Sequence, residues 1–154
     1  MKRIVDSVKA EGITGIAICP ETMGKSAQIG TVKEIAEFCN IAPFYYPCVD
    51  FGHVNSLWQG SIKTTSDYED IFNTIISVCG REKLDKMHVH FSKIMYSQKG
   101  EVKHLTFADT EFGPEPNEFL QAVKKFGISP YVICESAGTQ DLDSKTMKQL
   151  YLSL

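Results

Sequence analysis

The chain has 154 residues, of which 43% are hydrophobic and 23% are charged, and its formal net charge is −3. These values fit one globular domain over residues 1–154 and exclude a disordered chain. A net negative charge argues against a protein that coats DNA nonspecifically, because such binding needs a broad positive field.

The cysteines and the hydropathy pattern predict the cellular compartment. The five cysteines are odd in number and form no Cys-x-x-Cys pair, which is typical of reduced, buried thiols. No stretch approaches the roughly 18 consecutive apolar residues that a membrane span needs. We therefore expect a cytoplasmic protein that does not associate with a membrane.

The first third of the chain predicts a helix, a strand and a second helix. Residues 1–12, MKRIVDSVKAEG, have the apolar spacing of an amphipathic helix. The apolar run GITGIAICPE predicts a strand that ends at Glu21, and TVKEIAEFCN, residues 31–40, again has helical spacing.

Two further strand and helix units are expected in the middle of the chain. The run FYYPCVDFGH predicts a strand ending at Asp50, with Pro47 in or near it. A capping box of Ser66 and Glu69 is expected to begin the helix that Gly80 ends. The strand KMHVHF follows, then a long connection over about residues 93–113 and a helix that ends at Gly127.

The last unit consists of the strand SPYVICES and the helix DSKTMKQLYL. The resulting order is one helix followed by four βα units whose strands are almost continuously apolar, which is typical of a parallel sheet. We therefore predict an α/β fold in the form of a partial TIM (β/α)8 barrel.

Residues able to bind a metal follow the strands at the positions where parallel α/β folds gather reactive groups. Carboxylates neutralise a divalent cation and imidazoles add affinity, and Zn²⁺ or Mn²⁺ accepts both. Each residue alone has an ordinary structural explanation, such as a helix cap or a buried histidine, but their coincidence at four strand ends favours a site. The candidates are Glu21, Asp50, His53, His88, His90, His104 and Glu135.

With these motifs the chain resembles the endonuclease IV family, also called apurinic/apyrimidinic endonuclease family 2, of the xylose-isomerase-like TIM barrel superfamily. The resemblance covers residues 1 to about 154 and matches the C-terminal half of the barrel. The motifs that carry it are ICPETMGK, CVDFGHVNS, KMHVHFSK, KHLTF and VICESAG.

The resemblance implies a zinc-dependent hydrolase that cleaves DNA at abasic sites during DNA repair, with up to three Zn²⁺ ions in the family and fewer here. Glu21 and Glu135 would be the central catalytic residues. His90 would support the site indirectly, and Val102 stands where the family has an aspartate, with Glu101 beside it as a candidate substitute. The implied metal ligands are Glu21, Asp50, His53, His88, His104 and Glu135.

Four strands cannot close an eight-stranded barrel, so the nuclease site is expected to be incomplete in this chain. The chain is expected either to associate with a copy of itself or to be a truncated product that lacks an N-terminal half barrel. Two alternatives stay open: a sugar isomerase or epimerase of the same superfamily with one divalent metal, and a non-catalytic metal-binding half barrel.

Overall fold

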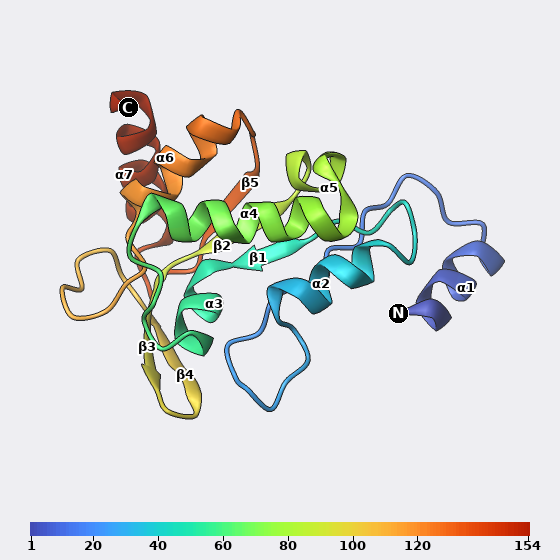
Figure 1. Ribbon diagram of the computed structural model, residues 1–154, viewed down its shortest axis with the longest axis horizontal. Coiled ribbons are helices and arrows are strands. Elements are labelled where there is room, and N and C mark those ends of the chain that lie inside the picture. Colours follow the sequence, from blue (N-terminus) through green and yellow to red (C-terminus); the bar gives the residue numbers. More distant parts are fainter.

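The computed structural model describes residues 1–154 and contains two small sheets. The parallel sheet has the order β1-β2-β5 and is formed by β1 (Cys48–Asp50), β2 (His88–Phe91) and β5 (Tyr131–Cys134). The antiparallel sheet is a hairpin of β3 (Lys93–Ser97) and β4 (Gly100–Leu105), which projects from the body in Figure 1.

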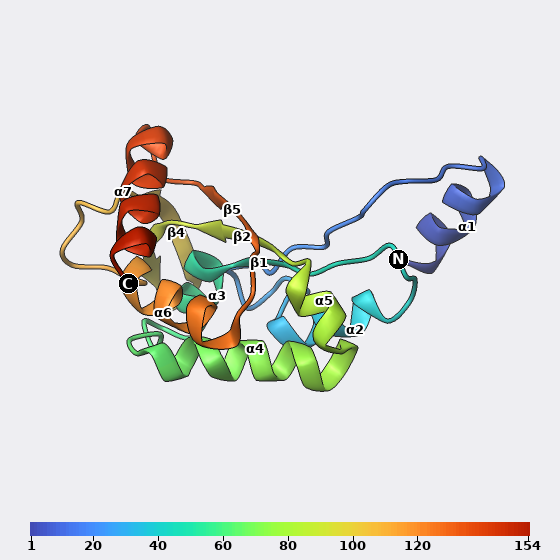
Figure 2. The same cartoon turned by 90° about the horizontal axis from the view of Figure 1, so that it is seen from above.

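The chain has seven helices, and none of them is both long enough and apolar enough to cross a membrane. Figure 2 shows α4 running along one side of the parallel sheet, whereas α1 lies away from the body at the end of an extended segment. The helices are α1 (Lys2–Ala10), α2 (Val32–Cys39), α3 (Phe51–Leu57), α4 (Thr65–Cys79), α5 (Arg81–Asp85), α6 (Pro116–Phe126) and α7 (Gln140–Ser153).

The prediction of a partial TIM (β/α)8 barrel with four parallel βα units is wrong. The first expected strand forms only isolated bridges, Ile18 with Tyr45 and Glu21 with Cys48. Asp50 already caps α3, so β1 is only three residues long. After β2 the chain forms the antiparallel β3-β4 hairpin, where the barrel pattern requires a helix. Three strands of a parallel sheet remain.

The ends of the long helices follow local capping chemistry. The capping box that begins α4 consists of Thr64 and Asp67, so the expected box of Ser66 and Glu69 is wrong. Asp67 accepts hydrogen bonds from the backbone N–H groups of Lys63 and Thr64 at 2.9 and 2.7 Å. The expected end of α6 is confirmed, because Gly127 adopts the left-handed conformation with φ of 61°.

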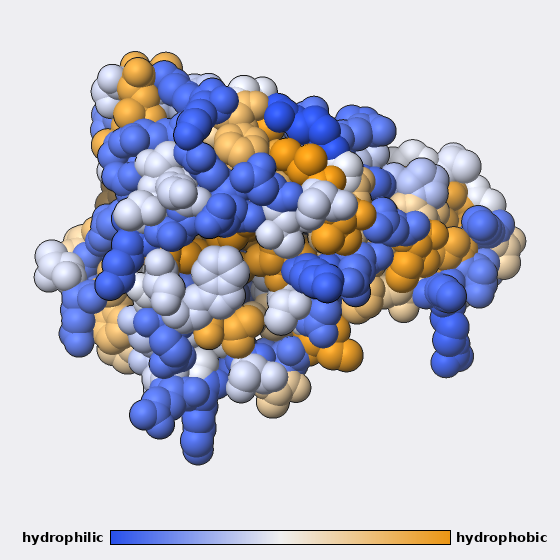
Figure 3. All heavy atoms as spheres, viewed as in Figure 1, coloured by the Kyte–Doolittle hydropathy of each residue, from blue (hydrophilic) through white to orange (hydrophobic).

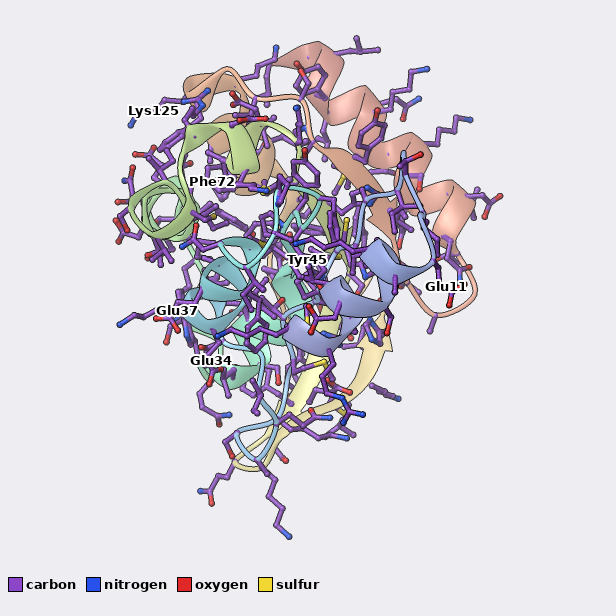
Figure 4. The ribbon with its side chains drawn as sticks, turned by 90° about the vertical axis from the view of Figure 1, so that its right-hand side faces the viewer. Glu11, Glu34, Glu37, Tyr45, Phe72 and Lys125 are labelled. Atoms are coloured by element: carbon purple, nitrogen blue, oxygen red, sulfur yellow. The ribbon has the colours of Figure 1, made fainter.

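The main hydrophobic core lies where α3, α4 and α6 meet the strands. Phe51, Phe72, Phe91 and Phe119 are fully buried, and the Phe51 and Phe119 ring centroids are 5.0 Å apart. In Figure 4, Phe72 lies within the body and Lys125 reaches outward from it. This core holds α3 and the parallel strands in place, and these elements carry most of the candidate ligands.

A smaller cluster of Val5, Cys39, Ala42 and Tyr45 attaches α1 to the body. The Tyr45 hydroxyl donates a hydrogen bond to the Met1 carbonyl oxygen at 3.1 Å, and Figure 4 shows Tyr45 beside α1. Figure 3 shows a mostly hydrophilic face with apolar atoms exposed near its centre, at its upper left and toward the α1 end. All five cysteines are free thiols, as expected; Cys39, Cys48 and Cys134 are buried, whereas Cys19 and Cys79 are only half-buried.

Candidate metal centre

Four acidic and imidazole side chains meet at the carboxyl ends of the parallel strands. Glu21 forms the bridge beside β1, Asp50 ends β1, His90 is in β2, and Glu135 directly follows β5. Since parallel strands end at a common edge of a sheet, segments more than a hundred residues apart place their side chains together. One ligand atom from each of the four lies within 4.8 Å of the others, so this group could hold a metal ion.

His90 lies between the two glutamates of this first group. Its Nδ1 atom is 3.1 Å from Glu21 Oε1 and 3.2 Å from Glu135 Oε1. Hydrogen bonds to the Cys48 thiol and the Glu21 carboxylate raise the pKa of His90 to about 11, and the bond to His90 lowers the pKa of Glu21. The protonated His90 ring therefore lies between the two carboxylates. A cation bound at this point would take the place of the Nδ1 proton, because an imidazole must lose that proton to become a ligand.

Asp50 is the most buried acidic residue of the site, with 0% of its surface exposed. Its Oδ1 atom accepts the backbone N–H of His53 at 2.8 Å and caps α3. Its Oδ2 atom is buried and has no hydrogen-bond partner. Burial raises the pKa of this carboxyl to about 7, and the Glu135 and Glu21 charges act in the same direction. An unpartnered buried carboxylate oxygen fits a cation ligand, since a cation would compensate for the lost hydration.

Asp50 also belongs to a second group, with His53 and His104, whose ligand atoms lie within 4.8 Å of one another. His53 Nδ1 is 2.9 Å from the Thr22 carbonyl oxygen, and His104 Nδ1 is 2.8 Å from Ser92 Oγ. The two ring centroids are 5.4 Å apart. Because protein oxygens engage each Nδ1 atom, the Nε2 atoms are the ones left to bind a cation.

The structure brings together five of the six ligands that the sequence predicts: Glu21, Asp50, His53, His104 and Glu135. His88 is not among them, because its ring stacks on Tyr131 with centroids 5.3 Å apart. His88 pairs with Cys48 near the start of the strands, whereas His90 pairs with Asp50 at their ends. The position of His90 nearer the carboxyl end of KMHVHF is the sequence signal that could have identified His90, in place of His88, as the candidate ligand.

The end of α3 and the start of β3 carry Trp58, Gln59 and Lys93, which are side chains of the kinds that contact DNA. Lys93 is only 5% exposed, and its Nζ atom is 2.7 Å from Glu115 Oε1, so it is engaged inside the protein. The Gln59 amide donates to the Ser56 and Ser97 carbonyl oxygens. Trp58, 40% exposed, remains accessible.

Comparison with known proteins leaves the activity open. No protein-family model matches the sequence. The chain is 34% identical over 139 residues to an uncharacterised protein of the archaeon Methanocaldococcus jannaschii, and the match covers 88% of this chain and 48% of that protein. The chain therefore spans about half the length of the curated relative it matches. Neither finding points to endonuclease IV, so that resemblance stays a prediction, and the geometry supports a group of residues that could hold a metal ion.

Proposed function

We propose that this chain is a divalent-metal-dependent phosphodiesterase that acts on DNA at abasic sites. The observation that carries the proposal is the buried, unpartnered Asp50 Oδ2 atom, which lies where two groups of potential ligands meet. Two neighbouring cation positions suit phosphodiester cleavage, in which the attacking and the leaving oxygen both need stabilisation. The mixture of carboxylates and imidazoles favours Zn²⁺, with Mn²⁺ as the second choice.

The side chains have two roles, which are neutralising the charge of the cations and transferring protons. When bound, divalent cations supply Lewis acidity and lower the pKa of water. Asp50, which is fully buried, would serve charge neutralisation only. Glu21 and Glu135 are 32% and 33% exposed, so a substrate can reach them and they are the candidates to move protons. His90 holds both glutamates in place.

A second function is supported by the first group alone. Glu21, Asp50, His90 and Glu135 form a four-residue set for a single cation, with two accessible glutamates beside it. That arrangement suits a sugar isomerase or epimerase, in which a pair of bases moves a proton next to a carbonyl group. The second group of Asp50, His53 and His104 favours the phosphodiesterase, because a one-metal enzyme has no need of it.

A cleavage assay tests the proposal. The purified chain, supplied with Zn²⁺ or Mn²⁺, is incubated with a duplex oligonucleotide that carries one abasic-site analogue, and the products are separated on a denaturing gel. We expect a single cut at the analogue, none in the undamaged duplex, and none with the Asp50→Asn variant. Metal-loaded protein that leaves the duplex intact but exchanges a sugar C–H proton with deuterated water would favour the isomerase.

A further inference from the structure

We propose that Glu101 is an additional metal ligand, which binds a second cation together with the His53 Nε2 atom. This inference rests on the proposed metal centre, but it does not depend on which reaction the centre catalyses. Glu101 lies in β4, the second strand of the hairpin, and approaches the second group at His53.

The Glu101 carboxylate faces the imidazole without forming a hydrogen bond to it. Its Oε2 atom lies 3.2 Å from His53 Nε2, yet this oxygen is buried and has no hydrogen-bond partner. Two acceptor atoms that face each other in this way repel unless a proton or a cation lies between them. A cation ligated by both atoms removes that conflict and satisfies the buried oxygen.

The orientation of His53 directs its Nε2 atom at Glu101. The Nδ1 atom is 2.9 Å from the Thr22 carbonyl oxygen, which can only accept a hydrogen bond, so Nδ1 carries the hydrogen of the neutral ring. The Nε2 lone pair then points toward Glu101. A hydrogen bond from a metal-binding imidazole to a backbone carbonyl is the usual way in which a protein fixes the ligating nitrogen.

Two glycines leave the space that the Glu101 side chain and its strand occupy. A Cβ atom at Gly24 would clash with Glu101 Oε2 and would lie 3.2 Å from His53 Cδ2. Gly100 has a φ of +100°, and a Cβ atom there would clash with the Gly24 carbonyl oxygen. The same carbonyl accepts the Glu101 N–H at 3.0 Å. The hairpin can therefore approach the loop after Glu21 closely enough to carry a carboxylate to His53.

The charge of a divalent cation at the second position also favours Glu101 as a ligand. Asp50 supplies the only carboxylate of the second group, and it is shared with the first group. Two neutral imidazoles and a shared carboxylate leave most of a dication's charge uncompensated. A carboxylate from Glu101 supplies the missing negative charge.

Metal binding to the purified full chain tests the assignment. After chelation and dialysis, Co²⁺ is titrated in, and stoichiometry and Kd are read from its visible absorption and from calorimetry. We expect two sites in the wild-type protein. In Glu101→Gln the second site should lose affinity by at least about 10-fold, because removing even a residue that only supports a metal ligand costs about 10- to 100-fold, while the first site is unchanged. Glu111→Gln, on an exposed loop residue, is the matched control and should keep both sites.

The outcomes separate the inference from the proposed function. Two sites with unchanged Kd values in Glu101→Gln would overturn the assignment of Glu101, as would a single site in the wild type. Loss of the second site without cleavage of abasic DNA by the wild type would support the assignment and overturn the phosphodiesterase. Far-ultraviolet circular dichroism in the chelator checks that the variant folds, and Glu101→Asp, which keeps the charge, should recover part of the lost affinity.

Discussion

Replacing Asp50 with asparagine tests the metal centre at its most buried atom. Asparagine keeps an oxygen that can accept the His53 N–H, now at 2.8 Å, and so retains the cap of α3. It removes the charge from the unpartnered Oδ2 position. An unpaired charge costs more to bury than a neutral amide at the same place, so without metal we expect the variant to be more stable than the wild type at pH 8, by about 1–3 kcal/mol.

The sign of the pH dependence follows from the direction of the shift. Burial raises the pKa of Asp50 from an ordinary value of 3.8 to about 7, so the folded state binds the proton more tightly than the unfolded state does. Metal-free wild-type protein should therefore lose stability as the pH rises from about 4 to about 7. The variant has no such carboxyl at position 50 and should lose less stability over this range.

Added metal should reverse the order of the two proteins. A ligand at about one hundred times its Kd stabilises the folded state by about 2.7 kcal/mol. For a chain of 154 residues, that corresponds to a rise in Tm of about 5–11 °C. We expect this rise for the wild type in Zn²⁺ and only a small one for Asp50→Asn.

Scanning calorimetry of both proteins, in EDTA and in Zn²⁺, measures these differences. Asp70→Asn is the matched control, because Asp70 is exposed on α4 and far along the chain from any candidate ligand. A variant at position 50 that keeps the full zinc-dependent rise in Tm would refute the metal centre. A loss of stability in EDTA would show that the buried carboxylate stabilises the metal-free fold.

Two more predictions concern individual residues. His90→Gln should abolish tight Zn²⁺ binding in calorimetric titrations, while His88→Gln should leave it within about twofold, because His88 stacks on Tyr131 outside the cluster; the reverse result would restore His88 as the ligand. Asp67→Ala should cost about 1 kcal/mol in urea unfolding at neutral pH through the lost helix cap. Hydrogen bonds from the Lys63 and Thr64 N–H groups lower the pKa of Asp67, so this deficit should shrink as the pH falls below 3.8, and a constant deficit would argue against the cap.

The sequence predicted the positions of the acidic candidate ligands better than it predicted the fold around them. Glu21, Asp50 and Glu135 each directly follow or end an apolar run, and the rule that places such residues at one edge of a parallel sheet needs only the strand ends. That rule holds here for a sheet of three strands and a bridged segment as well as for a barrel. The apolar runs do not predict the length of each strand in the same way. Asp50 serves as both the end of β1 and the cap of α3, a choice that tertiary contacts decide.

The hairpin is the element that the sequence pattern hid most completely. Lys93 carries a charge but is 5% exposed because Glu115 neutralises it, so the strand shows no clean alternation of apolar and polar residues. A register shift between Met95 and Tyr96 interrupts the pattern further. The one sequence signal for the hairpin was the glycine at position 100, a residue type that is common in hairpin turns. In the structure Gly100 has a positive φ and follows the turn between β3 and β4.

The departure from the barrel pattern and the second group of potential ligands have one structural origin. A helix after β2 would carry the chain away from the strand ends and cover a face of the sheet, as α4 and α6 do. The hairpin instead turns back over α3, where His53 is anchored by its contact with Thr22. It thereby brings His104 within 5.4 Å of His53, measured between ring centroids, and Glu101 within 3.2 Å of the His53 Nε2 atom. The segment that breaks the βα repeat is therefore the one that can add a second cation position to the first.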